Sequence, residues 1–416
     1  MNKIMTLFLL LMSFQAFTEQ HPHLPLEMSS SEYQQLLRQH WFKFGDGMMK
    51  ANGPEVQAAI DGGEIFSKWL KTINAKRPLN DQIRLSEGTG PGGGIPIAKP
   101  SKYGPKTISK KLREIQNEMP KAMLRIIYGG LNMTDAIPPS ISKEDFIKHG
   151  RTANGLYQSA VRWSTSIEPR LDYYKRNKRR DIRGFYHLKK IEDLDATLND
   201  YFILGPEKQK EFKKHLIGLC MNSKNSLSTC ESQFKRAAQS AKVREFKNKF
   251  WRAGQATWNS FYQISKPRTD VTWSPSSPNI MRAPFKDPKN TKIANWLKEN
   301  IEDEFKTDTW NFELDFENGS PEMAYLKFET GVTPHVTKGN IIVMDTNSPI
   351  EEYSVKWTIR HEYGHILRMP DCYVEFYDET EEVVVNYQLD VTDLMCSRAG
   401  DMNDRIYKEL KRVYYK

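Results

Sequence analysis

Two histidines four residues apart, His361 and His365, constrain this chain more than any other feature of its sequence. The segment around them, residues 352–367, has the pattern of a helix that ends before a Met-Pro pair. On a helix, a spacing of four places both imidazoles on one face, one turn apart. Two such nitrogens can hold one Zn²⁺ ion at about 2.0–2.1 Å each.

Acidic residues near the histidines add to this pattern. Glu362 is offset around the helix, so it can reach a water on the metal without displacing either histidine, as in the HExxH signature of zinc metalloproteases. A catalytic zinc site needs a third protein ligand and one open position. The carboxylates that follow the helix are candidates for this third ligand: Asp371, Glu375, Asp378, Glu381 and Glu382.

The string HEYGHILRMPDCY, residues 361–373, resembles the longer pattern HExxHxxGxxH/D of the metzincin clan of zinc proteases. The resemblance implies that Asp371 is the third ligand, as in the small bacterial members that use Asp, and that Met395 is the methionine of a turn beneath the metal. It covers residues 267–416 only. The clan has glycine at the position of Arg368, where the chain turns with positive φ, so the later carboxylates stay open as ligands.

Apolar patterning predicts an α+β fold in two regions. Residues 19–265 are expected to be a mostly helical N-terminal region, and residues 266–416 a zincin/metzincin-like catalytic domain with a small twisted sheet and an active-site helix. In the first region, helices are expected at residues 30–50, 55–74, 108–129, 143–163, 190–203, 206–219 and 229–264, with a Gly- and Pro-rich loop at 86–106.

The second region changes from helical spacing to alternation, which is typical of half-buried strands. Strands are expected at residues 312–317, 324–330 and 341–344, and helices at 291–305, 352–367 and 402–413. We expect the stretch between the last two helices to be irregular.

The first 18 residues have the pattern of a secretory signal peptide. Lys3 precedes a short apolar run at residues 4–12, and Ala16 and Thr18 supply small residues before a cleavage point. The run is shorter than the roughly 20 residues that a membrane-spanning helix needs. We therefore expect an exported protein, secreted or periplasmic, without a transmembrane segment in the mature chain.

The chain has four cysteines, at positions 220, 230, 372 and 396. In an exported protein, an even number suggests disulfides, and four cysteines allow three pairings. Proximity in sequence favours Cys220 with Cys230 and Cys372 with Cys396, and four buried thiols are the alternative.

Charge gives little information about partners. The 61 Lys and Arg residues exceed the 52 Asp and Glu residues by 9, a mild excess for which no nucleic-acid partner is expected. The basic run at residues 173–183 is either a solvated helix face, a contact with anionic cell-surface polymers, or a junction at which an N-terminal pro-segment is released. The N-terminal region is accordingly a hypothetical pro- or accessory domain.

These features predict an exported metalloendopeptidase with one catalytic zinc ion and a polypeptide substrate. Glu362 is expected to act as general base toward the zinc-activated water. Tyr373 or Tyr377 is the candidate donor to a reaction oxyanion, unless both only pack. The alternatives are a zinc amidase or peptidase that acts on cell-wall peptides, and a non-catalytic zincin-fold protein that binds a surface partner.

Overall fold

The computed structural model of the chain describes residues 53–86, 101–176, 182–223, 225–317, 319, 323–378 and 381–416. The expected signal peptide and the expected helix at residues 30–50 lie outside these ranges, as do residues 87–100 and residues 177–181 of the basic run. The described chain combines helices with small sheets, which confirms the mixed α and β composition.

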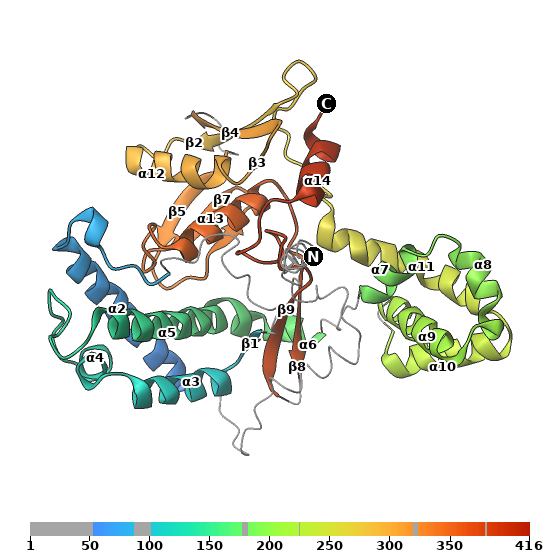
Figure 1. Cartoon of the computed structure of the whole chain (residues 1–416), viewed down its shortest axis with the longest axis horizontal. Coiled ribbons are helices and arrows are strands. Elements are labelled where there is room, and N and C mark those ends of the chain that lie inside the picture. The colour runs from blue at the N-terminus through green and yellow to red at the C-terminus, as the bar shows by residue number, and fades with distance from the viewer. Residues whose placement is uncertain are drawn as a thin grey trace, which may run out of the picture.

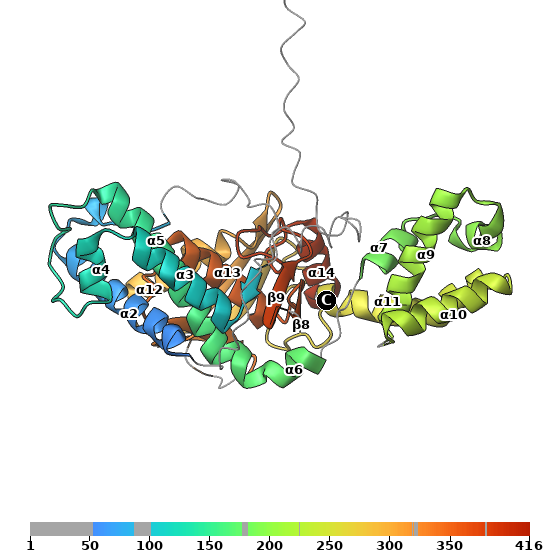
Figure 2. The same ribbon diagram turned by 90° about the horizontal axis from the view of Figure 1, so that it is seen from below.

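The molecule is elongated (Figures 1 and 2). The helical lobe (residues 183–262) forms one end, and the N-terminal bundle (residues 54–161) and the C-terminal part (residues 267–416) lie side by side toward the other. Each part buries most of its apolar side chains in a cluster of its own. No helix within the described ranges has the length and apolar content that crossing a membrane requires.

The N-terminal bundle is built around an aromatic cluster of Phe66, Trp69 and Phe146, in which the last two rings lie 5.1 Å apart. The predicted loop at 86–106 is wrong at its end, because residues 101–103 form a strand and Pro105 begins a helix. The elements of the N-terminal bundle are α2 (Pro54–Ala75), β1 (Ser101–Tyr103), α3 (Pro105–Glu118), α4 (Lys121–Ile127) and α5 (Lys143–Val161). A π-helical turn (Arg162–Ile167) follows α5 and leads toward α6 (Leu171–Arg176).

The helical lobe contains α7 (Arg183–Lys189), α8 (Leu194–Asn199), α9 (Pro206–Met221), α10 (Leu227–Gln239) and α11 (Val243–Tyr262). The single helix expected at 229–264 is wrong, because the chain breaks it at Ala241, whose φ of 54° lies in the left-handed region that ends helices. A disulfide between Cys220 and Cys230 joins α9 to α10.

The C-terminal part contains two three-stranded sheets with the orders β2-β4-β3 and β5-β7-β6. A parallel bridge between Phe285 and Ala324 joins β2 to the start of β5. Strands β2 and β4, and β5 and β7, run parallel, whereas β6 is an antiparallel edge strand. The strands are β2 (Ile280–Lys286), β3 (Lys306–Thr307), β4 (Trp310–Glu317), β5 (Tyr325–Glu329), β6 (His335–Thr337) and β7 (Ile341–Asp345), and the helices are α12 (Thr291–Leu297), α13 (Tyr353–Ile366) and α14 (Asp404–Tyr414).

Strands β2, β8 and β9 lie where no strand is predicted, as do the short strands β1, β3 and β6. Buried and less buried residues alternate along β2, with Met281, Ala283 and Phe285 buried. Pro284 lacks the backbone N–H of a regular strand residue, so the sequence does not look like a strand. The stretch expected to be irregular holds β8 (Tyr373–Asp378) and β9 (Val383–Gln388). These two strands form a sheet with the distant β1, in the order β1-β9-β8.

Hydrogen bonds attach the N-terminal bundle to the start of α13. The buried carboxylate of Glu352, the residue before α13, accepts the backbone amides of Leu85 and Ser86 at 2.8 and 2.9 Å. The Tyr157 hydroxyl on α5 donates to Asp345 at the end of β7 at 2.7 Å. The bundle therefore holds the helix that carries both histidines.

Replacing Glu352 with Ala should lower the free energy of unfolding by about 1–3 kcal/mol, because two backbone amides lose a buried acceptor. Urea unfolding followed by tryptophan fluorescence measures the change. The matched control is Glu351→Ala, which removes an ion pair with the exposed Lys292 and should cost about 1 kcal/mol or less. Equal losses in the two variants would contradict the proposed anchoring role.

Candidate metal centre

Helix α13 carries three of the residues singled out in the sequence. His361 and Glu362 are buried, at 5% and 6% exposure, and His365 is partly buried one turn later. The centroids of the two imidazole rings lie 4.8 Å apart and the rings are nearly perpendicular. The helix thus places both rings on one face, as their spacing predicts.

A backbone carbonyl orients each imidazole through its Nδ1 atom. His361 Nδ1 lies 2.8 Å from the carbonyl oxygen of Leu394, and His365 Nδ1 lies 2.9 Å from that of Met369. When Nδ1–H donates to a carbonyl, the neutral ring keeps its lone pair on Nε2. Such outer contacts are the usual means by which metal-binding histidines are oriented.

The chain turns sharply after α13, at Arg368. Its φ of 67° lies in the left-handed region, which costs a non-glycine residue about 1–2 kcal/mol. The Arg368 amide donates to the His365 carbonyl at 2.9 Å, and the Met369 amide donates to the Gly364 carbonyl at 3.0 Å. The backbone therefore turns with positive φ where the metzincin clan has glycine, although the residue here is arginine.

This turn brings Asp371 against both histidines. Its Oδ1 atom lies 3.2 Å from His361 Nε2 and 3.1 Å from His365 Nε2. The potential ligand atoms of these three residues all lie within 4.8 Å of one another. The structure thus brings together the two histidines and the carboxylate six residues beyond them.

Two of the alternative carboxylates form ion pairs with basic residues of the N-terminal half. Glu375 forms an ion pair with Arg162 at 2.5 Å, and Glu382 forms one with Lys106 at 2.7 Å. None of Glu375, Asp378, Glu381 and Glu382 belongs to a potential metal-binding group within the described ranges. The other such group is Cys372, Asp393 and Cys396, whose two sulfurs are joined to each other in a disulfide.

The chemistry of the three groups suits a divalent cation. Asp371 Oδ1 is buried and has no hydrogen-bond partner, although two nitrogens lie within 3.2 Å of it. Two ligands on one tetrahedral zinc ion, each at about 2.0–2.1 Å, lie about 3.3 Å apart. The two distances from Asp371 Oδ1 are close to that value, so the donor set fits zinc.

Attraction between the Asp371 carboxylate and the two imidazoles determines the direction of the pKa shifts in the site. Burial lowers the pKa of His365, but the Asp371 carboxylate and the nearby Glu362 outweigh burial and raise it to about 9. Burial alone would raise the pKa of Asp371, yet the two imidazoles hold it well below its usual range. Positive charge is therefore favoured beside this carboxylate, whether from a proton or from a metal ion.

Met395 packs directly beneath α13. A Cβ atom added to Gly364 would lie only 2.3 Å from Met395 Sδ, so glycine lets the methionine contact the helix backbone. The buried Asp393 carboxylate shapes this loop, because it accepts the Met395 amide at 2.9 Å and Arg405 Nε at 2.6 Å. No sequence pattern predicts this role of Asp393.

A disulfide ties the loop of Asp371 to the loop of Met395. Cys372 is bonded to Cys396, and the Cys372 amide also donates to the Met395 carbonyl at 3.1 Å. Closing a loop of this length contributes about 3–4 kcal/mol on the chain-entropy estimate. Both cysteine pairs in the structure are those that proximity in sequence favours.

A cleft of about 680 Å³ opens over His361, His365 and Asp371, and Glu362 also lines it. Edge strand β6 and the residues before it form part of its wall, including the exposed His335, which is outside the potential metal-binding groups. Another part of the wall comes from the N-terminal half of the chain: Ser101, Tyr103, Arg162, Ser166, Arg170, Tyr173 and Tyr174.

The two candidate tyrosines lie in different places. Tyr373 lines the cleft, and burial together with the Asp371 carboxylate raises its pKa well above the usual value. Tyr377 instead packs against the apolar core of the N-terminal bundle. Sequence reasoning missed Arg162 and Arg398 as cleft residues, because neither is near the histidines in sequence or belongs to a motif.

Gly364→Ala should destabilise the protein by about 1–3 kcal/mol, because the new methyl group would overlap Met395 and displace its loop. Gly155→Ala is the control: it lies in α5 with open space around its Cβ position and should stabilise by about 0.4–1 kcal/mol. Thermal unfolding of both variants tests the contact. If Gly364→Ala is as stable as Gly155→Ala, Met395 does not support the helix.

Comparison of the chain with protein-family models, with curated proteins and with solved structures finds no significant match.

Proposed function

We propose that the protein is a zinc-dependent endopeptidase. The supporting observation is the convergence of His361 Nε2, His365 Nε2 and Asp371 Oδ1 in a cleft that Glu362 also lines. Two imidazoles and a carboxylate form a three-ligand set that leaves one position for water or substrate, as catalytic zinc sites do. In this proposal His361, His365 and Asp371 hold one zinc ion.

A zinc ion held by His361, His365 and Asp371 would supply Lewis-acid chemistry, lowering the pKa of a bound water toward about 7 and polarising a carbonyl group. Glu362 accepts the proton of the attacking water and passes it to the leaving amine. The carboxylate suits this role because it lines the cleft next to both histidines and is not among the proposed ligands. Tyr373 is the better placed of the two tyrosines to donate to the developing oxyanion, since it lines the same cleft.

Edge strand β6 supports a peptide as the substrate. It pairs with β7 on one side only, and His335 and Val336 on it line the cleft. An extended peptide can add to such an edge by backbone hydrogen bonds. Together with the turn at Arg368 and the position of Met395 beneath α13, this edge supports the assignment of residues 267–416 to a metzincin-like domain.

Export is part of the proposal. Disulfides form and persist in oxidising compartments, and the structure contains two. An exported peptidase would act on polypeptides outside the cytoplasm, in the periplasm or after secretion.

Glu362→Gln should keep the zinc and lower peptide hydrolysis by about 10²–10⁴-fold, because the proton acceptor is lost while the ligands remain. Metal analysis and casein cleavage of the same preparation measure both quantities. Glu351→Gln, at an exposed ion pair before α13, is the control and should cleave normally. Unchanged cleavage by Glu362→Gln would refute the role of Glu362. A zinc-loaded wild type that cleaves neither casein nor cell-wall peptides would favour a surface-binding protein.

Loss of a residue that only hydrogen-bonds to a metal ligand weakens metal binding by about 10–100-fold. Asp371→Ala should weaken zinc binding by more than this, because it removes a direct ligand. Competition with a fluorescent chelator measures the affinity. Glu382→Ala removes another of the candidate carboxylates, one that pairs with Lys106, and should leave the affinity unchanged. The reverse order of effects would assign the third ligand to the later stretch.

A further inference from the structure

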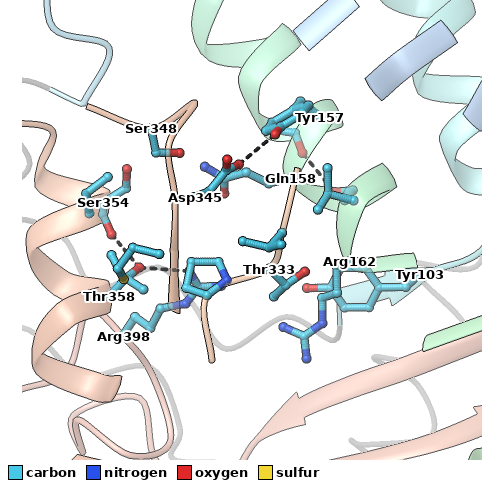
Figure 3. Close-up of a pocket in the computed structure, with 17 residues that line it drawn as sticks. Tyr103, Tyr157, Gln158, Arg162, Thr333, Asp345, Ser348, Ser354, Thr358 and Arg398 are labelled. Carbon is cyan, nitrogen blue, oxygen red and sulfur yellow. Dashed lines mark hydrogen bonds between the residues drawn. The ribbon is translucent and has the colours of Figure 1, made fainter. Parts of the chain in front are cut away.

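A side pocket of about 110 Å³, drawn in Figure 3, shares lining residues with the cleft. Residues of β1 and α5 line it from the N-terminal bundle, and residues of β7 and α13 line it from the C-terminal part. The residues that line both the side pocket and the cleft are Tyr103, Arg162, Thr333, Pro334 and Arg398. The two spaces are therefore adjacent.

The side pocket lies close to the metal-binding face of α13. Thr358, in its lining, precedes His361 by three residues, which is about one helical turn. Arg398 Nη1 donates to the Thr358 hydroxyl at 3.0 Å. The volume is several times the roughly 10–15 Å³ that one water needs, which suits a single amino-acid side chain.

The two guanidinium groups in the lining differ in their partners. Arg162 is ion-paired with Glu375 at 2.5 Å and lies over the ring of Tyr103. Arg398 bonds the neutral Thr358 hydroxyl and forms no ion pair with a carboxylate within the described ranges. Among the described residues, Arg398 therefore has no ion-pair partner at the place where the two spaces meet.

The carboxylate group in the lining of the side pocket, that of Asp345, already accepts hydrogen bonds from the protein. It accepts the amides of Gly331 at 3.2 Å and Asn347 at 3.0 Å, and the Tyr157 hydroxyl at 2.7 Å. Thr333 Oγ1, by contrast, is buried without a hydrogen-bond partner. The side pocket thus offers a guanidinium group and an unused hydroxyl group to a ligand.

We propose that the side pocket receives an acidic side chain of the peptide substrate near the scissile bond, and that Arg398 selects it. A carboxylate can form charge-assisted hydrogen bonds with the guanidinium group and accept one from the Thr333 hydroxyl. A lysine or arginine side chain is repelled. This inference rests on the proposed peptidase function and adds a charge preference, in which the N-terminal bundle supplies one wall of the specificity site.

The test uses zinc-loaded Glu362→Gln protein, so that peptides bind without being cleaved. Fluorescent hexapeptides carry Glu, Gln or Lys at one position at a time, and anisotropy gives their affinities. At one position Glu should bind about 10-fold or more tightly than Gln, and Lys more weakly than both. Adding Arg398→Gln should abolish the difference, and adding Arg398→Glu should transfer the preference to Lys.

Arg252→Gln is the control, because this exposed residue of α11 lines neither space. It should keep the full preference for Glu, and circular dichroism with zinc analysis verifies that every variant is folded and loaded. Equal affinities for Glu and Gln, a preference that survives Arg398→Gln, or no binding at all would overturn the inference. Failure of the proposed function is a separate result, in which the zinc-loaded wild type binds the peptides but cleaves none of them.

Discussion

The contact between one carboxylate oxygen and two imidazole nitrogens is the constraint on which the rest of the site depends. Asp371 Oδ1 lies about as close to His361 Nε2 and His365 Nε2 as ligands of one metal ion lie to each other. A carboxylate whose Oδ1 atom is buried needs a positive charge beside that atom. The helix end, the left-handed turn at Arg368 and the disulfide from Cys372 all hold the carboxylate there.

The N-terminal half of the chain belongs to the architecture of the cleft. Strand β1 pairs with β9, which lies in the segment that follows Asp371, and Arg162 pairs with Glu375 on β8. Side chains from the π-helical turn and α6 form part of the wall. A pro- or accessory domain that only covered the site from outside would not need these contacts. We therefore regard the N-terminal half of the chain as part of the cleft wall.

Elements with strong local patterns were predictable from the sequence. The helices expected at 55–74, 143–163 and 352–367 correspond to α2, α5 and α13. Elements that depend on distant partners were missed. Strand β2 contains Pro284, which has no backbone N–H and is unusual within a strand. The break between helices at Ala241 has no proline or glycine beside it, and β9 pairs with a strand from the other half of the chain. These cases are decided by burial and pairing rather than by local preference.

The sequence alone determined that two imidazoles share a helix face, because a spacing of four residues has one geometric meaning on a helix. It also made the two cysteine pairs the favoured ones, since close cysteines meet easily. Only the tertiary structure decided which carboxylate meets the histidines, what packs beneath them, and which arginines line the cleft. Arg162 and Glu375, for example, form an ion pair although they lie far apart in the sequence. Such contacts arise from the packing of whole elements, which leaves no periodic trace in the sequence.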